Sequence, residues 1–215
     1  MLNLHLVAWG LGVQSMVMIK GLLMRVLVIA WLLSFSMPIF AGPALPSDSV
    51  YQVGGIWQTD NNQSIQLESL VGKAQVMALI FTGCSNSCPI IVESMKRIEN
   101  KIPIKMRDHV GFVLVSLTPD TDTPKSLKAF AEKKGLNQNW KLLRGNNALV
   151  RTISNALNGR YKFVKEGDVA HSNTVTLLNN QGQIQMQSSG TLTGIKPILE
   201  AVEKDYTNVT LDAKH

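Results

Sequence analysis

The only two cysteines of the chain, Cys84 and Cys88, lie four residues apart between a predicted strand and a predicted helix. The near-continuous apolar run over 75–81 predicts a strand that is buried on both faces. Pro89 follows the pair, and proline is favoured at the start of a helix, where its missing N–H would have no partner. A thiol at a helix start is stabilised as a thiolate. Three chemistries are therefore open: a disulfide staple, thiol–disulfide exchange, or binding of a soft metal ion.

The rest of the pattern alternates between strand and helix signals. Ahead of the cysteines, the alternation over 51–58 and 64–67 predicts a half-buried β-hairpin region. After them, we expect strands at 111–117 and 161–164, a hairpin of 174–178 with 183–187, and helices that begin near Pro89, Thr123 and Asn146 and at 195. This order predicts one α/β domain over residues 47–209. The expected fold is thioredoxin-like, with a central mixed sheet flanked by helices and an N-terminal β-hairpin extension.

Residues 1–41 have the layout of an export segment. Arg25 precedes an apolar run of about 15 residues that ends in a small residue, which is typical of a cleaved secretory signal. An uncleaved membrane anchor is the alternative, because residues 22–23 bring the run close to the roughly 20 residues of a spanning helix. Met24 is the expected biological start. Either alternative predicts an exported, periplasmic domain, soluble or attached to the inner membrane by its N-terminus.

The charge of the chain excludes one class of partner. The formal net charge is +6, and it falls to +4 without Lys20 and Arg25 of the leader. The basic residues are scattered and are not interleaved with aromatic residues, so no nucleic-acid partner is expected.

In an exported chain a disulfide can form and persist. A binding domain stapled by Cys84 and Cys88, without metal, is therefore one of the open interpretations.

A metal site built on two thiolates needs a further ligand. Soft thiolates favour copper(I) or zinc, and the chain has four histidines. His171 is the strongest candidate, because in a thioredoxin-like fold its loop faces the cysteine loop. Thioredoxins place a cis-proline there, but no proline occurs between Pro124 and Pro197. The other three histidines lie in the leader, in a charged stretch expected at the surface, and at the chain end: His5, His109 and His215.

Three segments carry a resemblance to a known family. They are Phe81-Thr82-x-Cys84-x-x-x-Cys88-Pro89, the stretch 115–124 with its Asp122-Thr123-Pro124, and His171-Ser172 ahead of the hairpin. In order and spacing, from about residue 50 to 206, the chain resembles the SCO/SenC family of copper-binding proteins. The resemblance implies a thioredoxin-like fold and copper bound by Cys84, Cys88 and His171. It departs from the family pattern at Ser85-Asn86-Ser87, Thr118, Ala170 and Asn179, which indicates a divergent member.

The same resemblance implies a function in respiratory enzyme assembly. We expect a copper chaperone without turnover of its own, which delivers copper to the binuclear centre of cytochrome c oxidase, with the apo form of subunit II as partner. The alternative is a thiol–disulfide oxidoreductase that keeps the cysteines of a copper enzyme reduced. A peroxidase is disfavoured, because Thr82 is near the cysteines but no arginine is. Asp120 and Asp122 are expected to cap the helix that begins at Pro124 rather than to bind metal.

Overall fold

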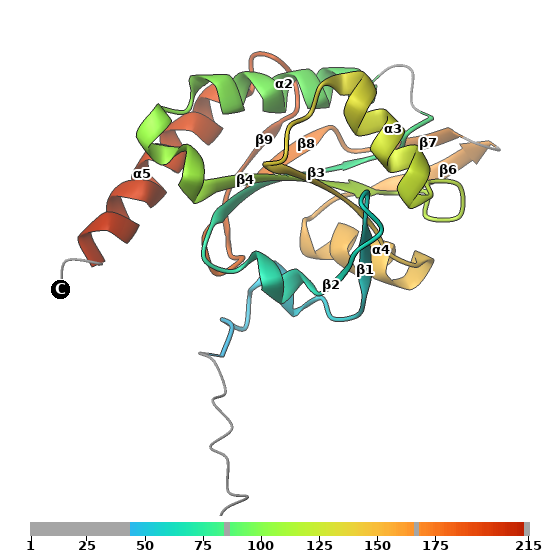
Figure 1. Cartoon of the computed structure of the whole chain (residues 1–215), viewed down its shortest axis with the longest axis horizontal. Coiled ribbons are helices and arrows are strands. Elements are labelled where there is room, and N and C mark those ends of the chain that lie inside the picture. The colour runs from blue at the N-terminus through green and yellow to red at the C-terminus, as the bar shows by residue number, and fades with distance from the viewer. Residues whose placement is uncertain (1–43, 84–86, 166–167, 213–215) are drawn as a thin grey trace, which may run out of the picture. The chain divides into compact units, whose positions relative to one another are not determined.

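The computed structural model describes residues 44–83, 87–165 and 168–212, and a seven-stranded mixed sheet lies at its centre (Figure 1). The strand order is β2-β1-β5-β4-β3-β8-β9. Strand β3 is parallel to β4 and β4 to β5, whereas β8 is antiparallel to both β3 and β9. This mixed sheet with its flanking helices confirms the predicted fold class. The strands of this central part are β3 (Ala74–Ile80), β4 (Val110–Ser116), β5 (Trp140–Arg144), β8 (Thr174–Leu178) and β9 (Ile184–Ser189).

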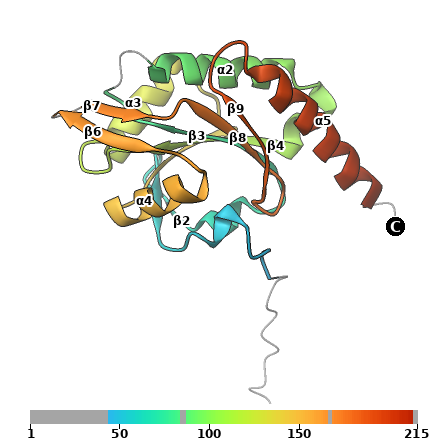
Figure 2. The same ribbon diagram turned by 180° about the vertical axis from the view of Figure 1, so that it is seen from behind.

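The two middle strands are covered on both faces. Every residue of β3 and of β4 is buried, which explains their nearly unbroken apolar sequences. Helices α2, α3 and α5 lie on one face of the sheet and α4 lies on the other, as the two opposite views show (Figures 1 and 2). The helices are α2 (Ser87–Lys101), α3 (Pro124–Lys134), α4 (Asn147–Ala156) and α5 (Ile195–Asp212).

The predicted helix starts at Thr123 and Asn146 are confirmed. The hydroxyl of Thr123 accepts a hydrogen bond from the backbone N–H of Ser126 at 3.2 Å. The side chain of Asn146 accepts one from the N–H of Leu149 at 2.9 Å. Each bond satisfies an N–H group that has no partner within its own helix.

The region before the cysteines follows the prediction in part. Strands β1 (Trp57–Thr59) and β2 (Ser64–Ile65) form the expected hairpin, and β1 also pairs with β5. The strand expected over 51–53 is wrong. A 3-10 turn, η1 (Val50–Gln52), takes its place, because Ser49 accepts a hydrogen bond from the N–H of Tyr51 and begins a turn there. A second 3-10 turn, η2 (Leu67–Leu70), follows the hairpin.

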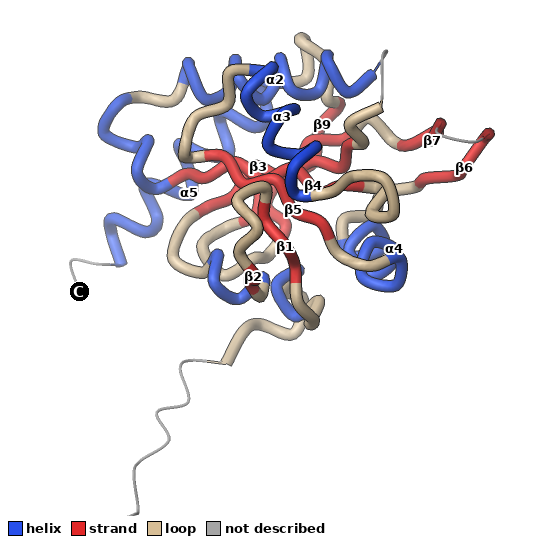
Figure 3. The backbone as a smooth tube through the Cα atoms, turned by 45° about the vertical axis from the view of Figure 1, so that its right-hand side comes forward, coloured by secondary structure: helices blue, strands red, loops and turns tan. Residues whose placement is uncertain are grey.

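A small two-stranded sheet stands apart from the main one. It consists of β6 (Tyr161–Lys165) and β7 (Asp168–His171), and it extends away from the seven-stranded sheet (Figure 3). The sequence predicts β6 but neither β7 nor β5, since β7 is short and β5 carries an exposed lysine, Lys141, within its apolar residues. The 3-10 helix η3 (Ile104–His109), which precedes β4, is also unpredicted.

The predicted leader lies outside the described residues. From Leu45 onward the described residues belong to one compact unit, while the expected limits of the leader, 1–41, and of the domain, 47–209, stay predictions. None of the helices within 44–83, 87–165 and 168–212 combines the length and the apolar character that crossing a membrane requires.

Candidate metal centre

The strand that leads to the cysteines ends in the core. Phe81 directly follows β3 and is only 3% exposed, whereas Thr82 is half-buried and Gly83 is exposed. The chain therefore leaves the core just before Cys84, which itself lies outside the described residues. Cys88 falls in the first turn of α2, where the backbone alone is described. The N–H groups at a helix start favour the thiolate form of a cysteine, which is the form that the sequence predicts for Cys88.

His171 lies beside the end of that same strand. It is the last residue of β7, and it pairs with Tyr161 across the small hairpin. Its imidazole lies edge-on to the ring of Phe81, with 6.0 Å between the ring centroids. The sequence predicts a loop at this position, which is wrong, because the segment pairs with β6 as a strand. The contact with Phe81 nevertheless brings the imidazole next to the residue that stands three places before Cys84.

The hydrogen bonding of His171 defines its tautomer. Its Nδ1 lies 3.1 Å from the carbonyl oxygen of Ser172, and a carbonyl can only accept, so Nδ1 carries the proton. Partial burial lowers the pKa of His171, and the hydrogen bond to Ser172 opposes this effect in part. A neutral imidazole with its proton on Nδ1 has its lone pair on Nε2. This is the form in which histidine binds a metal ion, with the other ring nitrogen held by a backbone carbonyl.

A buried carboxylate, that of Asp122, is hydrogen-bonded to the segment that follows β3. Asp122 is 1% exposed and accepts hydrogen bonds from both the N–H and the hydroxyl of Thr82, at 3.2 and 2.5 Å. It also accepts from the hydroxyls of Ser116, at 2.7 Å, and Thr118, at 3.0 Å. Asp122 therefore joins the segment that leads to Cys84 to the end of β4.

This role of Asp122 corrects the expectation that it caps a helix. Thr123 is the capping residue of α3, so Asp122 lies one residue too far from the helix to do so. Asp120 does not cap this helix either; its exposed carboxylate accepts a hydrogen bond from the amide of Asn147 at 2.9 Å. The sequence itself indicates which residue caps the helix. Pro124 occupies the first helical position, which makes Thr123 the cap.

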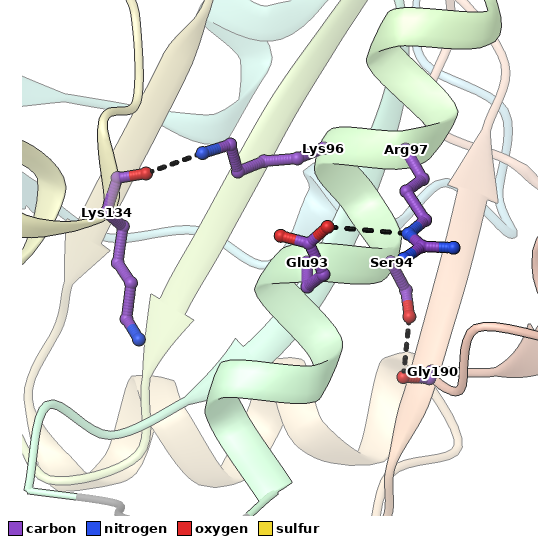
Figure 4. Close-up of polar contacts among 6 residues, drawn as sticks. All are labelled: Glu93, Ser94, Lys96, Arg97, Lys134 and Gly190. Carbon is purple, nitrogen blue, oxygen red and sulfur yellow. Dashed lines mark hydrogen bonds and ion pairs between the residues drawn. The ribbon is translucent and has the colours of Figure 1, made fainter.

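Helix α2, which carries Cys88 in its first turn, is joined by hydrogen bonds to the elements on both of its sides (Figure 4). The buried hydroxyl of Ser94 donates to the carbonyl of Gly190, which follows β9, at 3.1 Å. The ammonium group of Lys96 donates to the carbonyl of Lys134 at the end of α3, at 2.8 Å. Gly190 in turn donates its N–H to the carbonyl of Asn173, two residues after His171. A chain of two hydrogen bonds thus links the cysteine-bearing helix to the segment of His171.

Among the described side chains, His171 is the one member of the predicted ligand set. Within the described residues, no three His, Cys, Asp or Glu side chains gather as a metal-binding group. The thiols of Cys84 and Cys88 are not among the described side chains, so the set of Cys84, Cys88 and His171 stays a prediction. His109 is exposed, and its ring lies edge-on to that of Tyr206 on α5, at 5.1 Å between centroids.

The fold and the site define a thioredoxin-like α/β domain with an imidazole beside the strand that leads to a cysteine-bearing helix. The SCO1/SenC family model matches residues 50–206, and the chain belongs to this family. Solved structures with the same fold include a SCO1/SenC family lipoprotein from Bacillus anthracis, at 24% identity and a TM-score of 0.64, over 70% of this chain and 92% of that one. Copper-bound ScoI from Arabidopsis thaliana has 17% identity and a TM-score of 0.62, over 73% and 99% of the two chains.

Two curated relatives match parts of the chain. A protein of Stutzerimonas stutzeri, named for copper binding, is 29% identical over 131 residues, which are 58% of this chain and 62% of that protein. The SCO1 protein homolog of Bacillus subtilis is 33% identical over 90 residues, 41% of this chain and 46% of the homolog. The chain thus matches less than two thirds of the length of either relative.

Proposed function

We propose that this protein binds one copper ion through Cys84, Cys88 and His171 and passes it to a respiratory copper enzyme. The observation that carries the proposal is the edge-on contact of His171 with Phe81, because it brings the imidazole to the strand end that leads to Cys84. Two thiolates and one neutral imidazole form a soft ligand set that suits copper(I).

Relatives of the chain support copper as the cargo. Structures of ScoI from Arabidopsis thaliana and from Bradyrhizobium japonicum, and of yeast Sco1, have copper bound. The Stutzerimonas stutzeri relative is named for copper binding. Family membership over residues 50–206 makes the same cargo the first choice for this chain.

The proposed recipient is the binuclear copper centre of cytochrome c oxidase, reached through the apo form of subunit II. A solved structure 24% identical to this chain is that of BsSco, described as a member of the Sco family of cytochrome c oxidase assembly proteins, which supports this choice. The recipient centre would lie outside the cytoplasm, so the proposal includes export of the domain to the periplasm, soluble or held by an N-terminal anchor. The relative from Bacillus anthracis is named as a lipoprotein, which supports an anchored, exported domain.

The second candidate function is thiol–disulfide exchange. A thiolate at the start of α2 attacks a client disulfide and forms a mixed disulfide, and the second cysteine then releases the client with both of its thiols reduced. One client disulfide is reduced for each Cys84–Cys88 disulfide formed. The position of Cys88 in the first turn of α2 favours this chemistry, and the structure of BsSco is described by a disulfide switch.

A copper(I) titration of the full-length chain, with both cysteines reduced and a chromogenic competitor present, tests the proposal. We expect one equivalent bound, a loss of at least about tenfold in affinity in His171→Ala, and no loss in His109→Ala. The second variant is a matched control, because His109 is an exposed histidine that contacts Tyr206. Unchanged affinity in His171→Ala contradicts the three-ligand site. An absence of copper binding, together with rapid reduction of a client disulfide, favours the oxidoreductase.

A further inference from the structure

The carboxylate of Asp122 accepts two hydrogen bonds from the same residue, Thr82. One carboxylate oxygen accepts from the hydroxyl of Thr82 and the other accepts from its backbone N–H. Together these bonds fix both the backbone and the side chain of Thr82, which stands two residues before Cys84. The hydroxyls of Ser116 and Thr118 also donate to Asp122, so every one of these partners is a donor.

The loop that presents Asp122 is itself well fixed. Its own N–H donates to the carbonyl of Thr118 at 2.8 Å, which closes a tight turn. The guanidinium group of Arg144, on β5, donates to the carbonyl of Pro119 in the same turn at 2.7 Å. The strands are joined directly as well, because Leu117 donates its N–H to the carbonyl of Ile80 at 2.7 Å. Asp122 is therefore a fixed point against which Thr82 can be held.

Stability alone is a poor explanation for this carboxylate. The ion pairs among the described residues involve Glu93 and Glu200, and Asp122 meets neutral hydroxyl and amide donors instead. Burial of a carboxylate without a cation is costly, and a neutral, well-packed side chain is often at least as stabilising. A buried charge that is held by neutral donors at a strand end next to a candidate site is better explained by positioning.

We propose that Asp122 is a positioning residue for the metal site, which acts through Thr82 to fix where the segment to Cys84 leaves β3. The inference rests on the proposed function, and it adds a residue that is not itself a ligand. Hydrogen-bonded groups behind the ligands of a metal site commonly change metal affinity by 10- to 100-fold when they are removed. Here the group lies behind the cysteine segment rather than behind the histidine.

Two variants test the proposal, each with a matched control. Thr82→Val removes the hydroxyl that donates to Asp122, and Asp122→Asn places an amide against donors. Thr59→Val is the control for the first, since Thr59, at the end of β1, is 3% exposed and its hydroxyl accepts a hydrogen bond from the backbone N–H of Gln63. Asp120→Asn is the control for the second, because it removes the other carboxylate of the same turn. The measurements are the copper(I) affinity and the reduction potential of the Cys84–Cys88 pair in the full-length chain.

We expect both test variants to bind copper(I) about tenfold more weakly than the native chain and to shift the reduction potential of the pair. We expect both controls to keep the native affinity and potential. Native values in Thr82→Val and in a folded Asp122→Asn overturn the inference, as does an equal loss in the controls. Failure of the native chain to bind copper refutes the proposed function instead, and the reduction potentials then still test the positioning role.

Discussion

The imidazole of His171 and the ring of Phe81 meet edge to face, 6.0 Å apart between centroids and with 79° between their planes. Phe81 belongs to the core and is joined by sequence to the cysteine segment, whereas His171 ends a hairpin that lies outside the main sheet. The contact is therefore the point at which a peripheral strand is held against the strand that leads to the thiols. Edge-to-face ring pairs contribute about 0.5–1.5 kcal/mol beyond the area that they bury.

Phe81→Leu is expected to loosen this contact. The variant keeps an apolar side chain in the core but loses the ring, so the free energy of unfolding falls by about 1 kcal/mol and the NMR signals of the His171 ring shift. Phe112→Leu is the matched control. Phe112 is equally buried and stacks on Trp140 at 4.8 Å, so its loss lowers stability but leaves the His171 signals in place. Unchanged His171 signals in Phe81→Leu contradict the described contact.

Gly182→Ala is expected to destabilise the fold more than Gly72→Ala. Both glycines have positive φ, +83° and +100°, so alanine strains the backbone at each by about 1 kcal/mol. At Gly182 a Cβ atom also meets the ring of Tyr51 at 2.5 Å and the hydroxyl of Ser49 at 2.6 Å, whereas at Gly72 nothing lies within 4 Å. Denaturant unfolding of the two variants measures the difference. Equal losses of stability disagree with the packing of the N-terminal turn against the β8–β9 hairpin.

Asp205→Asn is expected to raise stability at neutral pH. Burial raises the pKa of Asp205 above its ordinary value of 3.8, so the folded state disfavours the charged form. The protonated group favours the folded state below pH 3.8, and this contribution is lost as the pH rises through the raised pKa. The gain in melting temperature should therefore be larger at pH 7 than near pH 4.

The control for this experiment is Glu203→Gln, which removes an exposed carboxylate from the same helix. We expect it to change the melting temperature little at either pH, because exposed charges contribute little to stability. A gain in Asp205→Asn that is the same at pH 4 and pH 7, or that Glu203→Gln reproduces, argues against burial of Asp205 as the cause.

The sequence predicts the elements whose signals are local. The apolar runs of β3 and β4 and the caps at Thr123 and Asn146 need no tertiary information, and the structure has them. The turn at 50–52 has one local contact, the cap by Ser49, but it also depends on distant partners that the sequence pattern does not indicate. The N–H of Val50 donates to the carbonyl of Gly182, and Ser49 donates its hydroxyl to the carbonyl of Gln181. These contacts favour a compact turn where alternation alone predicts a strand.

The candidate site also has one part that the sequence predicts and one part that it does not. Cys84, Cys88 and His171 can be selected from residue type, spacing and family resemblance. The two hydrogen bonds from Thr82 to Asp122 join residues that are 40 apart in the chain, and neither residue type requires the other as its partner. Only the parallel pairing of β3 with β4 brings their ends together and allows the bond.

X-ray absorption at the copper edge of the copper(I)-loaded, full-length chain tests the central claim most directly. The account predicts a first shell of two sulfur atoms and one imidazole nitrogen, with the imidazole contribution lost in His171→Ala and kept in His109→Ala. A copper shell without an imidazole nitrogen in the native chain, or one that His171→Ala leaves unchanged, contradicts the assignment of His171 as the third ligand.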